Sequence, residues 1–454
     1  MSTTIPSHSP WIDQLRNDGV ARPLTHDQAT DVVIVGAGIA GVSTAFFVLR
    51  DTALRVLLIE RDRAGRGATG HNAGQLATYF ERPLLDLVDE YGFEQAMAAQ
   101  SAIDNTWDLI EILVAESGAT ARIDQFVGHM GMFALNHLEV HLAHSLLRQR
   151  GGLAVATCAV SAEAPFLDDI PAEFATLYSV VPQARIRELL RTDDDRYLAV
   201  MSDRKGCGNS ALLVEQVLDY LIARYPDRFQ LVDHTPVRHI SLDRSAATID
   251  ASDHCVTASR VVMCTNGFVD HVVENLAGDE IGASFNHRVH GTVGYMAGFV
   301  QDDVLEANAF SYIRNASIGG DIPYVYVTSR PFDRPSGQAT LTCIGGPEQI
   351  LDDRADYAPE AGFPEHVLHE IDSEILPIVH PSRPSGLAYD YAWHGLMGYS
   401  ESRVRQIGFE PRNPVLMYNL GCNGVGFMPS IYGGQRISQL LRGDPLGPSI
   451  FDPV

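Results

Sequence analysis

The feature that most constrains the fold of this chain is a glycine-rich turn between an apolar strand and an apolar helix. Residues 31–41 read DVVIVGAGIAG, an apolar strand followed at once by the spacing GxGxxG. A helix is predicted over 40–50 and a second apolar strand over 55–60, because both segments are mainly apolar and turn residues separate them. Together they form a βαβ unit that is typical of dinucleotide binding in Rossmann-type domains.

Each glycine of this turn has a physical purpose. Gly36 permits the tight turn, Gly38 lets a diphosphate approach the backbone, and Gly41 lets the helix pack closely on the strand. Ile39 and Ala40 stand at the start of the predicted helix, where unpaired N–H groups and the positive dipole end attract phosphate. The sequence therefore predicts that these five residues contact a dinucleotide.

Glu60 is the second polar signal of this unit. It stands at the end of the second strand, about 20 residues beyond the glycine turn, where a carboxylate accepts hydrogen bonds from ribose hydroxyls. A carboxylate there also disfavours a phosphate on the ribose. The turn and Glu60 fit NAD as well as FAD, so the rest of the chain has to decide the cofactor.

The charge of the chain excludes several partners. Fifty-seven acidic against 33 basic side chains give a formal net charge of -24, which repels nucleic acid and anionic lipid surfaces. The first residues lack the basic and apolar regions of a secretory signal, and no apolar run approaches the ~20 residues of a spanning helix. The 6 cysteines show no CxxC pair or zinc-like spacing. We therefore expect a cytoplasmic protein with reduced thiols and with neither a nucleic-acid nor a membrane partner.

The stretch after Glu60 narrows the choice of cofactor. Residues 61–75 read RDRAGRGATGHNAGQ and resemble the flavin-approach loop of the D-amino-acid oxidase family of FAD oxidoreductases, which includes glycine and sarcosine oxidases and the gamma-glutamylputrescine oxidase group. NAD dehydrogenases lack such a stretch, so the resemblance implies FAD as the cofactor. The residues of this loop that it assigns to the FAD site are Arg61, Ala68, Thr69, His71, Asn72, Ala73, Gly74 and Gln75.

Two later segments resemble the same family. Residues 261–267 (VVMCTNG) are similar to the strand and turn that pack on the diphosphate and adenosine of FAD, and residues 419–429 (NLGCNGVGFMP) are similar to the loop beside the flavin ring. In the second segment, N–H groups at a helix start would face the pyrimidine carbonyl and stabilise the charge of the reduced flavin. With the start of a short predicted strand at 237, these segments add to the predicted site Val237, Thr265, Asn266, Gly267, Gly421, Asn423, Gly424, Val425, Gly426 and Phe427.

The resemblance implies an α/β protein with a discontinuous, Rossmann-type FAD-binding domain and an α+β substrate domain whose sheet is mainly antiparallel. At 454 residues the chain exceeds the usual size of one core, which also favours two domains. An N-terminal arm over 1–30 is either a loose leader or, because Trp11, Ile12 and Leu15 fall at helical spacing, a short amphipathic turn packed on the body. The predicted FAD-binding domain comprises 31–85, 205–270 and 390–454, and the predicted substrate or cap domain comprises 86–204 and 271–389.

Two residues near the predicted flavin are candidates for its chemistry. His71 falls where some dimethylglycine and sarcosine dehydrogenases have a histidine bonded to the flavin, so a covalent link, a hydrogen bond near flavin N5 and a plain loop position all stay open. Lys205 is the only lysine of the chain. We expect it on the loop that enters a helix over 211–224, where a buried ammonium would favour reaction of the reduced flavin with oxygen. A surface position is the alternative.

Candidate substrate contacts lie on the predicted antiparallel sheet. An arginine fork suits an amino-acid carboxylate, and Arg288 is the candidate anchor, with a solvated or structural ion pair as the other interpretation. Tyr324 is the candidate ring contact for an amine, although aromatic residues on strands are usually core. The alternatives on the same sheet are Arg314 and Arg330 for the carboxylate and Tyr295, Tyr312 and Tyr326 for the ring contact.

The predicted reaction is FAD-dependent oxidation of the C–N bond of a small amine or amino acid. A hydride passes from the carbon beside a neutral amine to flavin N5, and the resulting imine hydrolyses. Oxygen is the expected electron acceptor. Two alternatives stay open: a secondary or N-methyl amine dehydrogenase that passes electrons to a carrier or quinone, and a non-catalytic FAD-binding protein. No metal is expected, because the sequence shows no ligand cluster.

Overall fold

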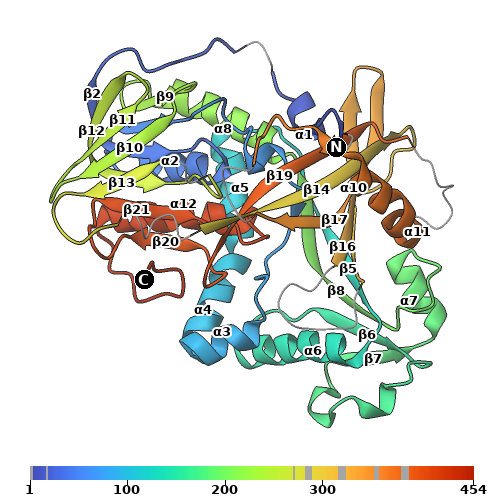
Figure 1. The fold of residues 1–454 in the computed structure, drawn as a ribbon. Coiled ribbons are helices and arrows are strands. Elements are labelled where there is room, and N and C mark those ends of the chain that lie inside the picture. The colour runs from blue at the N-terminus through green and yellow to red at the C-terminus, as the bar shows by residue number, and fades with distance from the viewer. Residues whose placement is uncertain are drawn as a thin grey trace.

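Two β-sheets lying beside each other organise the molecule (Figure 1). The structure is a computed structural model that describes residues 4–16, 19–268, 271–281, 289–314, 324–351, 357–379 and 388–454. The first sheet contains the predicted Rossmann unit, and the second is mostly antiparallel. The predicted α/β fold class is therefore confirmed.

The first sheet is parallel at its centre. In spatial order its strands are β13 (Val272–Asn275), β10 (Val237–Leu242), β11 (Ala247–Ala251), β12 (His254–Met263), β2 (Gln28–Val35), β3 (Val56–Ile59) and β9 (Phe229–Val232), with β21 (Leu416–Leu420) beside β12 and β20 (Gln406–Phe409) beside β21. β2 pairs in parallel with both β3 and β12. All four residues of β3 are buried, as expected for a parallel strand covered on both faces. The carboxyl ends of these strands meet at one edge, where ligands of such sheets bind.

The helices α2 (Ile39–Asp51) and α12 (Phe427–Arg442) cross in close contact beside this sheet (Figure 1). A Cβ on Gly434 would lie 2.7 Å from the carbonyl carbon of Ser43 and 2.8 Å from the nitrogen of Thr44. Only glycine fits at that distance, so the crossing brings the two backbones together. α5 (Thr106–Ser117) and α8 (Ser210–Arg224) also pack in this layer.

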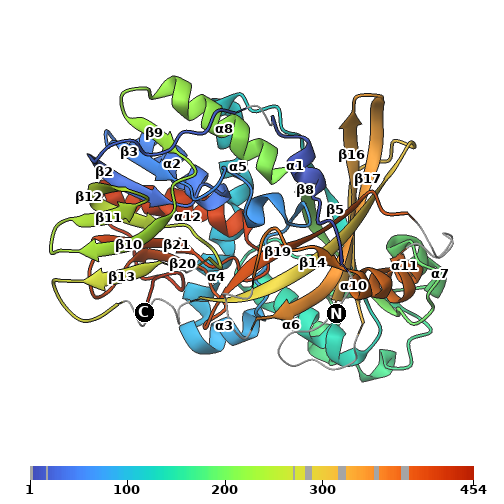
Figure 2. The ribbon, with the colours of Figure 1, turned by 45° about the horizontal axis from the view of Figure 1, so that its top comes forward.

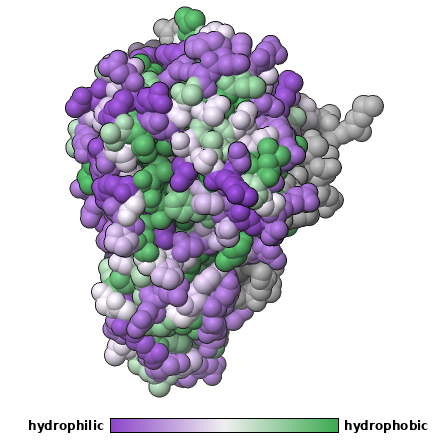
Figure 3. Space-filling model, turned by 90° about the vertical axis from the view of Figure 1, so that its left-hand side faces the viewer, coloured by the Kyte–Doolittle hydropathy of each residue, from purple (hydrophilic) through white to green (hydrophobic). Residues whose placement is uncertain are grey.

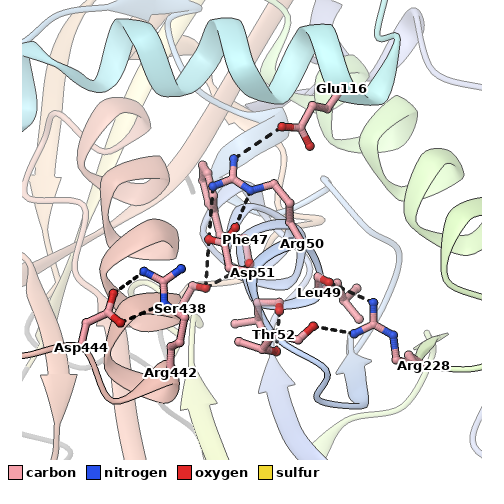
Figure 4. Close-up of polar contacts among 11 residues, drawn as sticks. Phe47, Leu49, Arg50, Asp51, Thr52, Glu116, Arg228, Ser438, Arg442 and Asp444 are labelled. Atoms are coloured by element: carbon pink, nitrogen blue, oxygen red, sulfur yellow. Dashed lines mark hydrogen bonds and ion pairs between the residues drawn. The ribbon is translucent and has the colours of Figure 1, made fainter.

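Polar contacts fix the far end of α2 (Figure 4). Arg228 donates hydrogen bonds to the carbonyls of Leu49 at 3.0 Å and Thr52 at 2.8 Å, which satisfies carbonyl groups that the helix end leaves unpaired. Ser438 on α12 donates to the carbonyl of Phe47 at 3.0 Å. The orientation of α2, and with it the direction of its N-terminus, is thus set by groups from distant parts of the chain.

The second sheet spans the other half of the molecule. Its strands are, in order, β19 (Tyr391–Ser400), β14 (Val289–Gln301), β17 (Gly337–Ile350), β16 (Tyr324–Arg334), β15 (Asn308–Ile313), β5 (Ile123–Met132), β8 (Ala199–Gly208), β6 (Thr157–Ser161) and β7 (Tyr178–Val181), with β4 (Gln75–Leu76) paired to β8. The pairings are antiparallel except for β15 with β5 and β6 with β7. The pattern agrees with the prediction of a mainly antiparallel sheet.

Helices cover the second sheet and the junction between the sheets (Figure 1). They are α3 (Leu84–Tyr91), α4 (Phe93–Asp104), α6 (Leu135–Arg150), α7 (Gln183–Leu190), α10 (Glu365–Glu370) and α11 (Leu376–Val379), with a π-helical turn over Ile371–Ile375 between the last two. The helical periodicity of 91–117 corresponds to two helices, because the chain leaves the helix at Asn105 before α5 begins.

The N-terminal arm packs on the body of the protein. α1 (Pro10–Asp13) lies beside α8 (Figure 2), and Trp11 is 0% exposed. β1 (Thr4–Ile5) pairs with β18 (Phe363–Pro364). Of the two alternatives for this arm, the structure shows the packed turn.

Sheet membership differs at several places from the predicted domain division. β4 lies in the second sheet although its residues fall in the predicted FAD-binding domain, and β8 runs across the predicted boundary at 204/205. β13 lies in the first sheet although its residues fall in the predicted substrate domain, and β19 lies in the second sheet although its residues fall in the predicted FAD-binding domain. The division into two domains stays a prediction. All six cysteines are free thiols.

Polar side chains cover most of the face shown in Figure 3, with smaller apolar areas among them. Within the described residues, no helix has the length and hydropathy needed to span a bilayer.

Candidate functional site

A cavity lies between the carboxyl edge of the first sheet and one face of the second sheet. Its walls come from the glycine turn, the loop over 60–77, the start of α12, and strands β14, β16 and β19. Of the residues predicted to bind FAD, those that line it are Gly36, Gly38, Ile39, Ala40, Glu60, Arg61, Ala68, Thr69, His71, Asn72, Ala73, Gly74, Gln75, Val237, Thr265, Asn266, Gly424, Val425, Gly426 and Phe427.

The glycine turn has no room for side chains. Gly36 has φ +101, and a Cβ there would lie 2.8 Å from the carbonyl oxygen of Cys264. A Cβ on Gly41 would lie 1.8 Å from the carbonyl oxygen of Gly36. Gly41 therefore does not line the cavity but holds the first turn of α2 against the end of β2. The N-terminus of α2 consequently points its positive dipole end into the cavity.

Glu60 stands at one end of the cavity. Its carboxylate accepts hydrogen bonds from the backbone N–H groups of Ala37 at 2.8 Å and Asp62 at 3.1 Å. Burial raises the pKa of Glu60, and the two N–H donors oppose that rise. Nearby, the Arg61 guanidinium carbon lies 3.9 Å from the ring centroid of Phe268. This end offers one carboxylate and a cation on an aromatic face, which suits a ribose and a base.

The loop that carries His71 is fixed from both sides. Asn72 donates to the carbonyl of Thr69 at 2.9 Å and to the hydroxyl of Ser210 at 2.7 Å, and its side-chain oxygen accepts from the N–H of Gly74 at 2.7 Å. On the other side, the indole N–H of Trp11 donates to the Asn72 carbonyl at 2.6 Å. The packed N-terminal arm is therefore a support of this loop.

His71 faces the cavity with one ring nitrogen engaged. Its Nδ1 lies 3.0 Å from the carbonyl oxygen of Gly67, so Nδ1 carries a proton and donates it to that carbonyl. Burial lowers the pKa of His71. The side chain is thus a neutral imidazole whose Nε2 is an acceptor.

The C-terminal loop turns through left-handed backbone conformations at Gly421, Asn423 and Gly424. The Asn423 side chain accepts from the backbone N–H of Ser400 at 2.8 Å. Gly421 and Asn423 therefore shape the loop from behind rather than line the cavity. No side chain caps the N-terminus of α12 at Gly426, so its first N–H groups are left for the cavity.

Asn266 joins three segments of the wall. Its side-chain oxygen accepts from the N–H groups of Gly398 at 3.3 Å and Cys422 at 3.0 Å, and its amide donates to the carbonyl of Leu396 at 3.1 Å. The neighbouring Gly267 does not line the cavity, because it packs against Leu396 and Met397. Asn266 thus ties β19 and the C-terminal loop to the end of β12.

Tyrosines and carboxylates gather where the second sheet meets the cavity. The Tyr324 hydroxyl donates to Glu81 Oε1 at 2.7 Å and lies 3.4 Å from the hydroxyl of Tyr79. Burial raises the pKa of both Tyr79 and Tyr324, so both remain hydroxyls. Tyr326 and Glu348 complete this wall. We refer to Tyr79, Glu81, Tyr324, Tyr326 and Glu348 as the tyrosine–glutamate wall.

The prediction that Lys205 lies on a loop is wrong. It lies on strand β8, because β8 continues to Gly208 while paired with β5 and β4. It is 5% exposed, which excludes the surface alternative. Its ammonium donates to Ser311 Oγ at 3.2 Å and to Gln75 Oε1 at 3.5 Å. Gln75 lines the cavity and Lys205 stands behind it. Burial lowers the pKa of Lys205 to about 8.

None of the three arginines predicted as carboxylate anchors is among the described residues that line the cavity. Arg288 lies outside the described residues. Arg314 pairs with Glu370 at 3.1 Å, and Arg330 lies 5.4 Å from the ring centroid of Trp11. Tyr312 is also core, since its hydroxyl donates to the carbonyl of Leu190.

Sequence reasoning missed several residues of the cavity. Tyr79 and Glu81 follow the flavin-approach loop directly, and their nearness to it is a signal that could have identified them. Glu348, Tyr357 and Arg405 come from distant segments and carry no local signal. Within the described residues, no group of three or more His, Cys, Asp or Glu side chains could hold a metal ion.

Comparison with known proteins decides the family. The family described as FAD dependent oxidoreductase, DAO, matches residues 31–440. The chain belongs to the DAO family of FAD-dependent oxidoreductases. This membership favours an oxidoreductase over the non-catalytic alternative.

Individual relatives of this DAO-family chain match over short stretches. The probable oxidoreductase OrdL of Haemophilus influenzae is 30% identical over 101 residues, which cover 22% of this chain and 23% of that protein. Gamma-glutamylputrescine oxidoreductase of Escherichia coli is 36% identical over 66 residues, which cover 14% of this chain and 15% of that protein. In both, the match spans less than a quarter of the relative's length.

Solved structures cover almost the whole chain. Glycine oxidase from Geobacillus kaustophilus superposes with a TM-score of 0.64 at 16% identity, over 94% of this chain and 98% of that one. L-proline dehydrogenase from P. horikoshii has a TM-score of 0.64 at 14% identity, over 94% and 97%. At these identities the likeness shows the fold alone, and it is the DAO-type fold that the sequence predicted.

The cavity of this DAO-family protein fits FAD. The side-chain-free turn and the N-terminus of α2 leave space and donors for a diphosphate. Glu60 is positioned for ribose hydroxyls, and the uncapped start of α12 offers N–H groups at the other side of the cavity. The donor set therefore matches the charged and polar parts of the cofactor that the family requires.

Proposed function

We propose that this protein oxidises the C–N bond of a small amine or amino acid, with FAD held non-covalently in the cavity. The observation that carries the proposal is the hydrogen-bonded pair of Tyr324 and Glu81, which lines the same cavity as the flavin-approach loop. Such a wall can bind an amine, and FAD, when bound, accepts the hydride.

The tyrosine–glutamate wall would hold and orient the amine. A carboxylate can accept several hydrogen bonds at once, so Glu81 can accept from an amine N–H as well as from Tyr324. The ring of Tyr326 adds a face that attracts an ammonium group. Orientation of the reacting C–H bond by such fixed groups is a main source of rate enhancement.

His71 is the proposed proton acceptor. An amine must lose its extra proton before hydride transfer, and a neutral imidazole, whose second ring nitrogen carries no proton, can take it. The hydrogen bond from Nδ1 to Gly67 fixes this tautomer. Protonation of His71 at low pH would remove the acceptor.

Oxygen is the proposed electron acceptor, and Lys205 is the residue proposed to promote its reaction. A buried ammonium stabilises the negative charge that oxygen gains when it takes an electron. Lys205 reaches the cavity through Gln75 and has no carboxylate partner within 4.0 Å in the described part of the chain.

The test is the visible absorption of purified protein, before and after anaerobic addition of a panel of primary amines, N-methyl amines and amino acids. Bleaching by one class supports the proposal and names the substrate class. Air is then admitted, and the hydrogen peroxide that forms is measured. Bleaching without peroxide would favour the dehydrogenase alternative, and no bleaching by any amine would refute the proposal. Acid precipitation, which releases only non-covalent FAD into the supernatant, tests the mode of attachment.

A further inference from the structure

Arg405 is a buried cation surrounded by uncharged acceptors. It is 5% exposed, lies just before β20 and lines the cavity. Its guanidinium donates to the side-chain oxygen of Asn419 at 2.6 Å, to the carbonyl of Asn419 at 2.7 Å and to the carbonyl of Gly421 at 3.1 Å. Among the described residues, no carboxylate oxygen lies within 4.0 Å of it.

A buried charge without an opposite charge is costly, because desolvation is not repaid by a partner. Burial lowers the pKa of Arg405 to about 10, which still leaves the guanidinium charged at neutral pH. The protein therefore maintains a positive charge at the wall of the cavity. The arrangement is explained if a ligand bound in the cavity gains a negative charge during the reaction, which this cation then balances.

The surroundings of Arg405 place this charge beside the loop at the start of α12. Asn419, its main partner, donates to the hydroxyl of Thr44 at 3.1 Å and to the carbonyl of Ser430 at 3.0 Å. It thereby links Arg405 to the first two turns of α2 and to the first turn of α12, whose N-termini carry positive dipole ends. The bond to Gly421 holds the residue from which the loop to Gly426 departs.

We propose that Arg405 is a positioning residue that provides the positive charge balancing the charge which the bound flavin gains on reduction. The inference rests on the proposed placement of FAD in this cavity. A hydride brings two electrons and one proton, so the neutral oxidised ring becomes an anion when it accepts one. A fixed cation near that ring favours the reduced form and makes the cofactor a stronger oxidant.

The experiment compares Arg405→Gln with Arg405→Lys, which keeps the charge but loses the guanidinium fork. The probes are the midpoint potential of bound FAD and the affinity for sulfite, which adds to oxidised flavin and leaves it anionic. In the Gln variant we expect sulfite to bind about tenfold more weakly, the effect of one charge about 10 Å away at intermediate dielectric. The midpoint potential should fall by about 30 mV, which is tenfold for a two-electron couple. The Lys variant should stay within about threefold of the wild type.

If Arg405→Gln does not fold, a second variant tests the same charge. Asn419→Asp places a carboxylate against the guanidinium while the arginine stays, and it should lower sulfite affinity in the same direction. A Gln variant that binds FAD with unchanged potential would overturn the inference. So would a loss of FAD affinity at unchanged potential, which would assign Arg405 to the diphosphate. Failure of the wild-type protein to bind FAD would instead refute the proposed function.

Discussion

The two ends of the cavity are built by different means. The end where we propose that FAD binds, called here the cofactor end, consists of backbone groups, helix N-termini and glycines such as Gly36 and Gly41, at which neighbouring atoms leave no room for a side chain. The end where we propose that the amine binds, called here the substrate end, consists of side chains on the second sheet, such as Tyr324 and Tyr326, together with Glu81, which accepts from Tyr324. A site made by backbone geometry tolerates almost no substitution, whereas a site made by side chains can change its ligand one residue at a time.

The largest effect is expected from Gly41→Ala. The new methyl would lie 1.8 Å from the carbonyl oxygen of Gly36, so the turn has to move away from the diphosphate. We expect at least about 100-fold weaker FAD binding, equivalent to ~3 kcal/mol of strain, measured by titration of apoprotein with FAD. Gly447→Ala is the control, because nothing lies within 4 Å of a Cβ there. Normal FAD binding by the Gly41 variant would contradict a backbone-defined cofactor end.

Lys205→Met tests a side chain that acts from behind the cavity wall, through its proposed role in the reaction with oxygen. Loss of the ammonium should slow reoxidation of the reduced enzyme by oxygen about 100-fold, the usual size of one lost electrostatic stabiliser. Anaerobic reduction by the amine should change little. Because the pKa of Lys205 is about 8, wild-type reoxidation should slow as the pH rises through about 8, and the Met variant should show no such step. Stopped-flow reoxidation over pH 6–10 measures both, and equal rates in the two proteins would exclude the role.

Lys205 also predicts how stability depends on pH. Its pKa falls from 10.5 to about 8 on folding, so between these values the unfolded chain binds more protons than the folded one. The free energy of unfolding should therefore rise with pH across that window, and below about pH 8 the full penalty of the buried charge is present. That penalty is about 3 kcal/mol. Lys205→Met should lose this dependence in denaturant titrations, and a wild-type curve that is flat from pH 8 to 10.5 would count against a buried ammonium.

Tyr324→Phe should have a smaller effect, and it should change the reaction with the substrate but not the binding of FAD. It removes the hydroxyl that donates to Glu81 and retains the ring. We expect kcat/KM for the amine to fall about tenfold, as for loss of one hydrogen bond to a charged group, with unchanged FAD affinity. Tyr312→Phe is the control, because its hydroxyl bonds to the Leu190 carbonyl in the core. A parallel loss of FAD binding in the Tyr324 variant would show that the two ends are not separate.

Trp11→Phe should produce the smallest effect. It removes the indole N–H that donates to the Asn72 carbonyl at 2.6 Å but keeps an aromatic ring under the loop. Loss of one neutral hydrogen bond is worth about 1 kcal/mol, so FAD should dissociate about fivefold faster. Trp393→Phe, which loses a longer bond of 3.3 Å to the same carbonyl, should matter less. If FAD leaves both variants at the wild-type rate, the arm does not support the loop.

The same contrast explains what could be predicted from the sequence. The glycine turn, α2 and β3 follow one another along the chain, so local pattern was enough for that unit. The flavin-approach and C-terminal loops were placed by resemblance, and both line the cavity. Whether these residues bind FAD in the predicted way stays a prediction.

At other positions the structure depends on pairing between strands that are distant in the sequence, which local sequence patterns do not predict. The sequence predicts Lys205 on the loop that enters the helix over 211–224, but pairing of β8 with β5 extends the strand beyond it. Arg405 gave no signal because its neighbours, Asn419 and Gly421, surround it only after β20 and β21 have paired. The substrate end depends on contacts of this kind, which no local pattern reports.

The close crossing of α2 and α12 has a consequence for biosynthesis. Part of the cavity lining begins at Gly36 and another part ends near Ser430, and the crossing at Gly434 holds α12 against α2. A ribosome makes a chain from the N-terminus at about 5–20 residues per second, so the wall at Gly36 is translated tens of seconds before its counterpart. The glycine turn therefore meets the last helix only when synthesis is nearly finished, and, on the proposed placement of FAD, we expect its cavity to be complete only then.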